Sequence, residues 1–109
     1  MKYRSKAPFR IGLAGGGTDV SPYSDVYGGA TLNATINLYA YTTIIPRTDG
    51  KIIIRAVDRA EELIFDSAEV LPVTGKLDLQ VGVYNRIVKQ FNKKGLSFEM
   101  ITSMDVSSG

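Results

Sequence analysis

Residues 30–45 alternate between apolar and polar side chains, and this alternation constrains the fold more than any other feature of the chain. The even positions are apolar except for Thr42, whereas the odd positions from 31 to 43 carry Thr, Asn or Tyr. A period of two residues is typical of a β-strand with one buried face and one polar face. We therefore predict a long strand over residues 30–45, which the pattern allows to break near Asn37.

Further strands are predicted on both sides of this one. Residues 2–14 alternate loosely and contain Pro8, which suits an edge strand or a bulge. Thr48-Asp49-Gly50 is typical of a hairpin turn, so residues 51–57 are expected to return beside the long strand. The remaining strands are expected over residues 61–66 and 98–106.

Two helices are predicted between the strands. Ser21 suits the N-cap and Pro22 the first position of a short helix, which Gly28-Gly29 ends. From Leu77 the apolar spacing becomes helical, and one face carries Tyr84, Ile87, Val88 and Phe91. Lys93 and Lys94 suit the C-terminal end of this helix, and Gly95 is its expected cap. The order of elements predicts an α+β fold, a mostly antiparallel sheet with helices on one face.

The composition excludes several kinds of chemistry. The sequence has no cysteine and no histidine, which excludes disulfides, zinc sites of the Cys/His type and nucleophiles that depend on a histidine base. The formal net charge is +2, so no polyelectrolyte partner is implied. No segment approaches the ~20 apolar residues of a membrane span, and the first residues lack the apolar core of a signal peptide. We therefore expect a cytoplasmic protein with no membrane partner.

The most distinctive motif is RIGLAGGGTD at residues 10–19. It is not a P-loop, because Thr18-Asp19 stands where Lys-Ser/Thr is required, and a carboxylate there would repel a phosphate. It is not a dinucleotide fingerprint either, because Val20 occupies the third glycine position. Asp19 suits sugar hydroxyls, and Arg10 could neutralise charge that develops during a group transfer. From the residues alone, a tight turn in which Asp19 caps the short helix remains an equal alternative.

Two segments together resemble a known family. KAPFRIGLAGGGTD and YGGATLNATINLYAYTTI resemble the opening of the GHMP small-molecule kinases, and are most similar to the bacterial D-glycero-D-manno-heptose 7-phosphate kinases. The match spans residue 6 to about residue 45, whereas residues 50–95 carry little family signal. The resemblance implies transfer of the ATP γ-phosphoryl group, with Mg²⁺ as the second cofactor, to a sugar or sugar-phosphate hydroxyl. For the heptose kinases, that acceptor is O1 of heptose 7-phosphate.

The resemblance also implies roles for individual residues. Arg10 takes the family's basic position near the transferring phosphate and is the catalytic candidate. Asp19 resembles the sugar-binding aspartate, and Gly16, Gly17 and Thr18 are substrate-binding candidates with it. Galactokinase-like members carry Glu-His where this chain has Gly16-Gly17, which opens space for a larger or already phosphorylated sugar. Asn33 and Tyr23 could approach the ligand, but we interpret them as strand-face and helix-surface residues. Lys6, Arg4 or a downstream basic residue could hold a substrate phosphate, and the sequence does not select among them.

Residues 104–109 resemble the lead-in to the family's Gly-Leu-Gly-Ser-Ser-Ser phosphate loop, so Gly109 is predicted at the edge of the ATP site. We expect residues 1–109 to be the amino-terminal part of an ATP- and sugar-binding domain, inactive alone and with apolar sheet surface exposed. The magnesium ligands and catalytic base are expected outside it, so no metal ligand is predicted here. Alternatives are a fucokinase-like or other sugar 1-kinase, a non-catalytic sugar-binding module and a nucleic-acid-binding module. The charge balance argues against the last of these.

Overall fold

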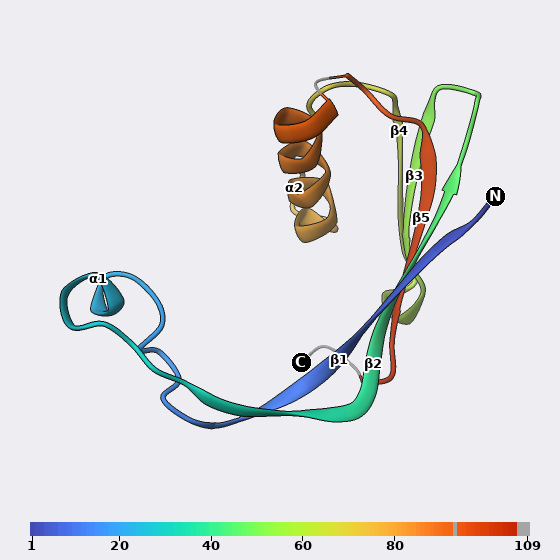
Figure 1. Ribbon diagram of the computed structural model, residues 1–109. Coiled ribbons are helices and arrows are strands. Elements are labelled where there is room, and N and C mark those ends of the chain that lie inside the picture. The colour runs from blue at the N-terminus through green and yellow to red at the C-terminus, as the bar shows by residue number, and fades with distance from the viewer. Residues whose placement is uncertain (93, 107–109) are drawn as a thin grey trace.

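The computed structural model describes residues 1–92 and 94–106, which form a five-stranded sheet with one helix packed on it (Figure 1). The strand order is β1-β2-β5-β3-β4, with every neighbouring pair antiparallel except β3 and β5. The strands are β1 (Tyr3–Ala14), β2 (Leu32–Pro46), β3 (Lys51–Ala56), β4 (Glu61–Asp66) and β5 (Phe98–Met104). The helices are α1 (Tyr23–Tyr27), α2 (Asp78–Ile87), a 3₁₀ turn η1 (Val57–Arg59) and a π-helical turn η2 (Val88–Asn92). The predicted α+β class is confirmed.

The predicted hairpin between β2 and β3 is wrong, because β5 lies between these two strands. The chain does turn at residues 48–50, where Arg47 pairs with Asp49 and its hydrogen bond lowers the pKa of that carboxyl to about 2. Strand pairing, however, follows apolar matching across the sheet: Met100 of β5 lies opposite Ile44 on one side and Ile54 on the other. A local turn signal cannot reveal that a later strand inserts between the two it connects.

The core lies between α2 and the β3–β5 part of the sheet. Its buried residues are Ile52, Ile54, Ala56, Leu71, Leu77, Val81, Tyr84, Val88 and Phe98. Ile87 and Phe91 were predicted on this face but are 44% and 70% exposed. Phe91 lies in η2, where the π-helical geometry no longer follows the 3.6-residue repeat. None of the helices in the described part of the chain is long and apolar enough to cross a membrane.

The predicted end of the second helix is only partly described. Lys93 lies outside the described residues. Gly95 does not have the left-handed conformation of a helix cap, so that prediction is wrong. Instead it lies close to the segment after β4, where an added Cβ would come within 2.6 Å of the Ser67 Oγ atom. The glycine therefore permits close packing between two connecting segments.

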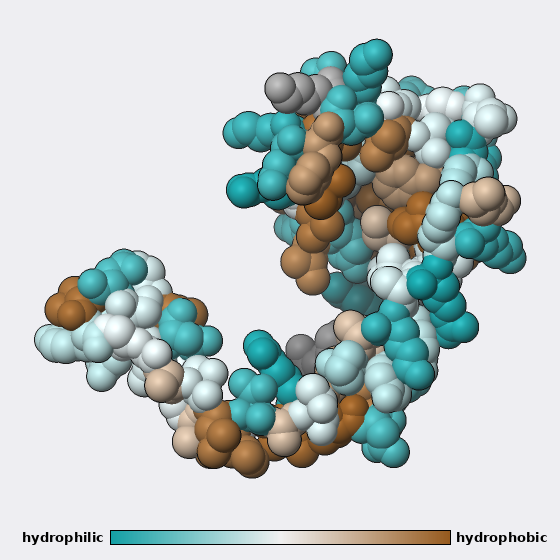
Figure 2. Space-filling view, in the orientation of Figure 1, coloured by the Kyte–Doolittle hydropathy of each residue, from teal (hydrophilic) through white to brown (hydrophobic). Residues whose placement is uncertain are grey.

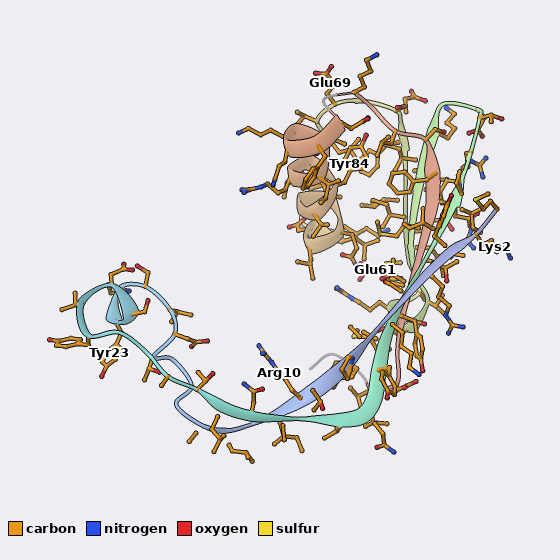
Figure 3. The ribbon with its side chains drawn as sticks, in the orientation of Figure 1. Lys2, Arg10, Tyr23, Glu61, Glu69 and Tyr84 are labelled. Carbon is orange, nitrogen blue, oxygen red and sulfur yellow. The ribbon has the colours of Figure 1, made fainter. Side chains whose placement is uncertain are left out.

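Tyr84 ties α2 to both of these connecting segments. Its buried hydroxyl donates a hydrogen bond to the Ala68 carbonyl oxygen (2.6 Å) and accepts one from the Leu96 N–H (3.0 Å) (Figure 3). We expect Tyr84→Phe to lower the free energy of unfolding by about 1–3 kcal/mol, because two backbone groups lose their partner. Urea denaturation measures the change, and Tyr27→Phe, at a residue 75% exposed, serves as the control. Equal stability of the two variants would contradict this role.

Strands β1 and β2 continue beyond the core as a curved two-stranded ribbon that carries α1 at its far end (Figure 1). The register shifts where Pro8 pairs with Tyr39 but Arg10 pairs with Thr35, which leaves residues 36–38 as a bulge. β2 itself runs unbroken from Leu32 to Pro46, so the predicted break near Asn37 is found only as this irregularity in its pairing. The edge position predicted for Pro8 is confirmed. The radius of gyration is 16.6 Å, against about 13 Å for a compact domain of this size.

The ribbon has little covering its apolar side chains. Ile11, Leu13 and Leu32 are 51%, 61% and 61% exposed, and no residue of β2 is fully buried. Figure 2 shows apolar atoms along the outer curve of the ribbon. The predicted exposure of apolar sheet surface is confirmed, whereas the prediction of one buried face for the long strand is wrong for the ribbon part. Patterning defines which residues share a face, but a face is buried only where another layer covers it.

Candidate functional site

The glycine motif lies at the far end of the ribbon and lines one side of an open groove of about 340 Å³. The groove brings together three of the predicted site residues, Arg10, Gly16 and Asp19. Its lining is completed by Gly12, Leu13, Ala14, Thr31, Leu32 and Asn33. The Arg10 side chain stands on the inner side of the curved ribbon (Figure 3). Residues from both strands and from the loop therefore face one small volume.

The loop is held in shape by a close crossing of two backbone segments. An added Cβ at Gly15 would lie 2.0 Å from the Ala30 carbonyl oxygen, and one at Gly29 would lie 1.8 Å from the Thr18 carbonyl oxygen. Gly15 also has φ +86°. Only glycine fits at either position, and the two glycines allow the segments at the start and the end of the loop to lie in close contact.

Thr18 stabilises this crossing with hydrogen bonds. Its hydroxyl lies 2.7 Å from the Gly15 carbonyl oxygen and 2.9 Å from the Ala30 carbonyl oxygen, and accepts from the Ala30 N–H at 3.2 Å. The Thr18 N–H also donates to the Gly15 carbonyl oxygen at 3.1 Å. Thr18 and Gly17 do not line the groove. Their substrate-binding roles therefore stay predictions, and the geometry gives Thr18 a structural role in the loop.

Neither of the two predicted N-caps of the short helix is formed. Helix α1 begins at Tyr23 with Pro22 as its N-cap, and no side chain makes a capping hydrogen bond. The Ser21 hydroxyl donates instead to the Asp25 carboxylate, so the prediction of Ser21 as N-cap is wrong. Asp19 does not cap α1 either, which removes the alternative that its carboxylate serves the helix. Gly28, with φ +72°, ends the helix as predicted.

The polar side chains of the groove are not engaged within the described part of the chain. Arg10, Asp19 and Asn33 make no side-chain hydrogen bond or ion pair there, whereas Asp49 and Asp66 each pair with a basic residue. Side chains that gather in a groove without pairing with each other remain available to a ligand.

A magnesium site needs several oxygen ligands, and the groove offers one carboxylate, Asp19. Across the described residues, no group of three or more His, Cys, Asp or Glu side chains is close enough to hold a metal ion. Mg²⁺ is usually held by one or two carboxylates together with substrate phosphates, so these residues alone would supply only part of a magnesium site. Gly109, predicted at the edge of an ATP site, lies outside the described residues.

Two further residues differ in their relation to the groove. Asn33 lines it, directly across the ribbon from Gly12, although the sequence pattern favoured a polar strand face over a position near the ligand. The signal that could have found it is this register, which places residue 33 beside the glycine motif. Tyr23 instead packs against Tyr27, with ring centroids 5.0 Å apart, and does not line the groove.

The basic residues near the start of the chain lie elsewhere. The Arg4 guanidinium carbon is 4.5 Å from the centre of the Tyr41 ring, and the Lys6 ammonium is 3.9 Å from the centre of the Tyr39 ring. Neither residue lines the groove. Each cation covers one face of an aromatic ring, so that face is closed to the stacking of nucleic-acid bases on which a nucleic-acid-binding module would depend.

No family model matches the chain. It is 52% identical over 106 residues to a D-glycero-α-D-manno-heptose 7-phosphate kinase of Campylobacter jejuni, a match that covers 97% of this chain and 31% of that protein. Among solved structures, a Campylobacter jejuni protein reported as a sugar kinase matches with TM-score 0.83 and 51% identity, over 99% of this chain and 34% of that one. A D-glycero-D-manno-heptose 1-phosphate kinase of Bacteroides thetaiotaomicron matches with TM-score 0.88 and 50% identity, over 100% and 35%.

The resemblance predicted from the sequence is therefore confirmed, and it extends well beyond residue 45. The chain spans about a third of the length of each of these proteins. Over nearly all of its own length, the chain is similar to part of a D-glycero-α-D-manno-heptose 7-phosphate kinase and shares the fold of that part of solved sugar kinases.

Proposed function

We propose that this chain supplies the sugar-binding part of a GHMP-type kinase that phosphorylates a hydroxyl of a heptose phosphate. The observation that carries the proposal is the groove, which gathers Arg10, Asp19 and the Gly16 backbone in a chain 52% identical to a heptose 7-phosphate kinase. In this proposal residues 1–109 are the amino-terminal part of an ATP- and sugar-binding domain and are inactive alone. ATP and Mg²⁺ are bound mainly by residues outside this range.

The groove residues have distinct proposed roles. The Asp19 carboxylate accepts hydrogen bonds from sugar hydroxyls, and the absence of a side chain at Gly16 lets the sugar approach the backbone. The Arg10 guanidinium neutralises negative charge on the phosphoryl group as its bond to ADP breaks and its bond to the sugar oxygen forms. Catalysis is then mostly positioning and charge neutralisation, which rigid strand and loop backbones suit.

The two named relatives differ in the position of the phosphate on the heptose for which each is named. One is named for heptose 7-phosphate and the other for heptose 1-phosphate. We propose the 7-phosphate, with O1 as the acceptor. The test uses the whole kinase to which, in this proposal, residues 1–109 belong; we call it the intact protein. ADP release is measured with Mg-ATP and each of four sugars in turn: D-glycero-D-manno-heptose 7-phosphate, the 1-phosphate, fucose and galactose. Turnover of fucose or galactose in preference to both heptose phosphates would favour a sugar 1-kinase instead.

Asp19→Asn isolates the proposed hydroxyl contact. The amide keeps the shape of the side chain but removes its charge and one acceptor oxygen. Because hydrogen bonds to a charged group contribute about 1.5–3 kcal/mol, we expect KM for the sugar phosphate to rise about 10- to 100-fold, and KM for ATP to stay unchanged. Steady-state kinetics of the intact protein measures both. Asp58→Asn, in η1 outside the groove, is the control, and identical KM values for the two variants would contradict the role of Asp19.

A further inference from the structure

Gly12 is a glycine that the fold itself does not require. It lies inside strand β1, its backbone is not in the left-handed region, and an added Cβ would meet no atom within 4 Å. Gly15 and Gly29, in contrast, are required by the backbone crossing. A glycine in a strand destabilises the strand relative to a residue with a side chain. The open space above Gly12 belongs to the groove, so its use is to be sought in a ligand.

Asn33 faces the same space. It is the register partner of Gly12 in the antiparallel pair of β1 and β2, so the side chains at these two positions project from the same face of the ribbon. Both residues line the groove. The Asn33 carboxamide makes no hydrogen bond within the described part of the chain. The pair therefore presents a polar side chain next to a vacant position.

The chemistry of the pair selects a neutral ligand group. A carboxamide offers two N–H donors and one oxygen acceptor, which matches hydroxyls, since each of these both donates and accepts. A phosphate offers only acceptors at neutral pH and is matched better by a cation. In the groove that cation is Arg10, which pairs with Thr35 rather than with Asn33.

We propose that Gly12 and Asn33 form a specificity subsite for the hydroxyl-bearing carbon chain of the sugar phosphate. Gly12 leaves the volume, and Asn33 hydrogen-bonds the hydroxyls that enter it. The inference rests on the proposed function and adds two residues to the sugar contacts. This subsite would distinguish substrates by the presence of hydroxyls at this position, whereas Asp19, in the loop, would contact other hydroxyls of the sugar.

Gly12→Val tests the subsite in the intact protein. Valine fills the volume and suits a β-strand, so we expect KM for heptose 7-phosphate to rise about tenfold or more while the thermal midpoint is unchanged or higher. Asn33→Leu, which keeps a similar size without hydrogen bonds, is expected to raise KM about 3- to 20-fold. KM for ATP is expected to be unaffected by either substitution. Gly82→Ala is the control, because Gly82 in α2 also has open space around it but lies outside this groove.

The outcomes separate the subsite from the proposed function. If the wild-type protein is active and Gly12→Val has an unchanged KM, the subsite is overturned and the proposed function stands. If the wild-type protein phosphorylates none of the sugars, the proposed function fails. Calorimetric titration with heptose 7-phosphate in the absence of ATP then decides on the subsite. Weaker binding by both variants than by the control supports it, and equal binding or no binding at all overturns it.

Discussion

Arg10→Gln is expected to lower kcat of the intact protein by about 10²- to 10³-fold, with a much smaller change in KM for the sugar. The transferred phosphoryl group spreads negative charge over its oxygens in the transition state, and a fixed cation there acts more strongly than on the ground state. Arg10 makes no ion pair within the described part of the chain, so its charge is not already neutralised by a neighbouring carboxylate. Single-turnover kinetics at saturating sugar phosphate measures the chemical step directly.

Two further variants show whether the effect comes from the charge and shape of the Arg10 side chain. Arg10→Lys keeps the charge but loses the planar fork of donors, so we expect an intermediate kcat. Arg86→Gln is the control, because Arg86 lies in α2, outside the groove, where its Nε donates to Gln90 of η2. We expect it to leave kcat unchanged. A tenfold rise in KM for the sugar with unchanged kcat in Arg10→Gln would instead identify Arg10 as a binding residue for the substrate's own phosphate.

The parts of the fold that the sequence predicted are those set by local patterns. Alternation identified β1, β2 and β5, and the pair Gly28-Gly29 ended α1 as expected. The insertion of β5 between β2 and β3 was missed, because it depends on Met100 meeting apolar partners in two strands that are distant in sequence. The exposure of Ile87 was missed because helical spacing shows which residues share a face and does not show how wide a strip the sheet covers.

The candidate site was predicted in a similar, partial way. The motif itself pointed to Arg10, Gly16 and Asp19, which the fold brings to one groove. Asn33 was undervalued, since its relation to Gly12 exists only through the register of two strands joined by a long loop. Thr18 was grouped with the ligand residues, although its hydroxyl lies within hydrogen-bonding distance of three backbone atoms, because a motif does not distinguish a residue that shapes a loop from one that touches a ligand.

Gly29→Ala is expected to lower kcat/KM of the intact protein by more than about 100-fold while the α2 core remains folded. The added methyl group would lie 1.8 Å from the Thr18 carbonyl oxygen and 3.0 Å from the Asp19 backbone nitrogen, so the two backbone segments must move apart. A displacement of about 1 Å in a positioning group can cost about 10²-fold in rate. Gly29 does not have a positive φ, so backbone strain plays no part and the clash alone is tested.

The location of the damage decides between a loop effect and general unfolding. Amide hydrogen exchange should become faster in residues 15–31 and stay unchanged in β3 and β5, which hold the buried residues Ile52, Ile54 and Phe98. Gly82→Ala, which adds the same methyl group in open space, should change neither the exchange nor the activity. If Gly29→Ala retained full activity with a displaced loop, the position of Asp19 would not be what the reaction depends on. Faster exchange throughout the sheet would mean that the ribbon and the core unfold as one unit, and that the crossing supports the whole fold as well as the groove.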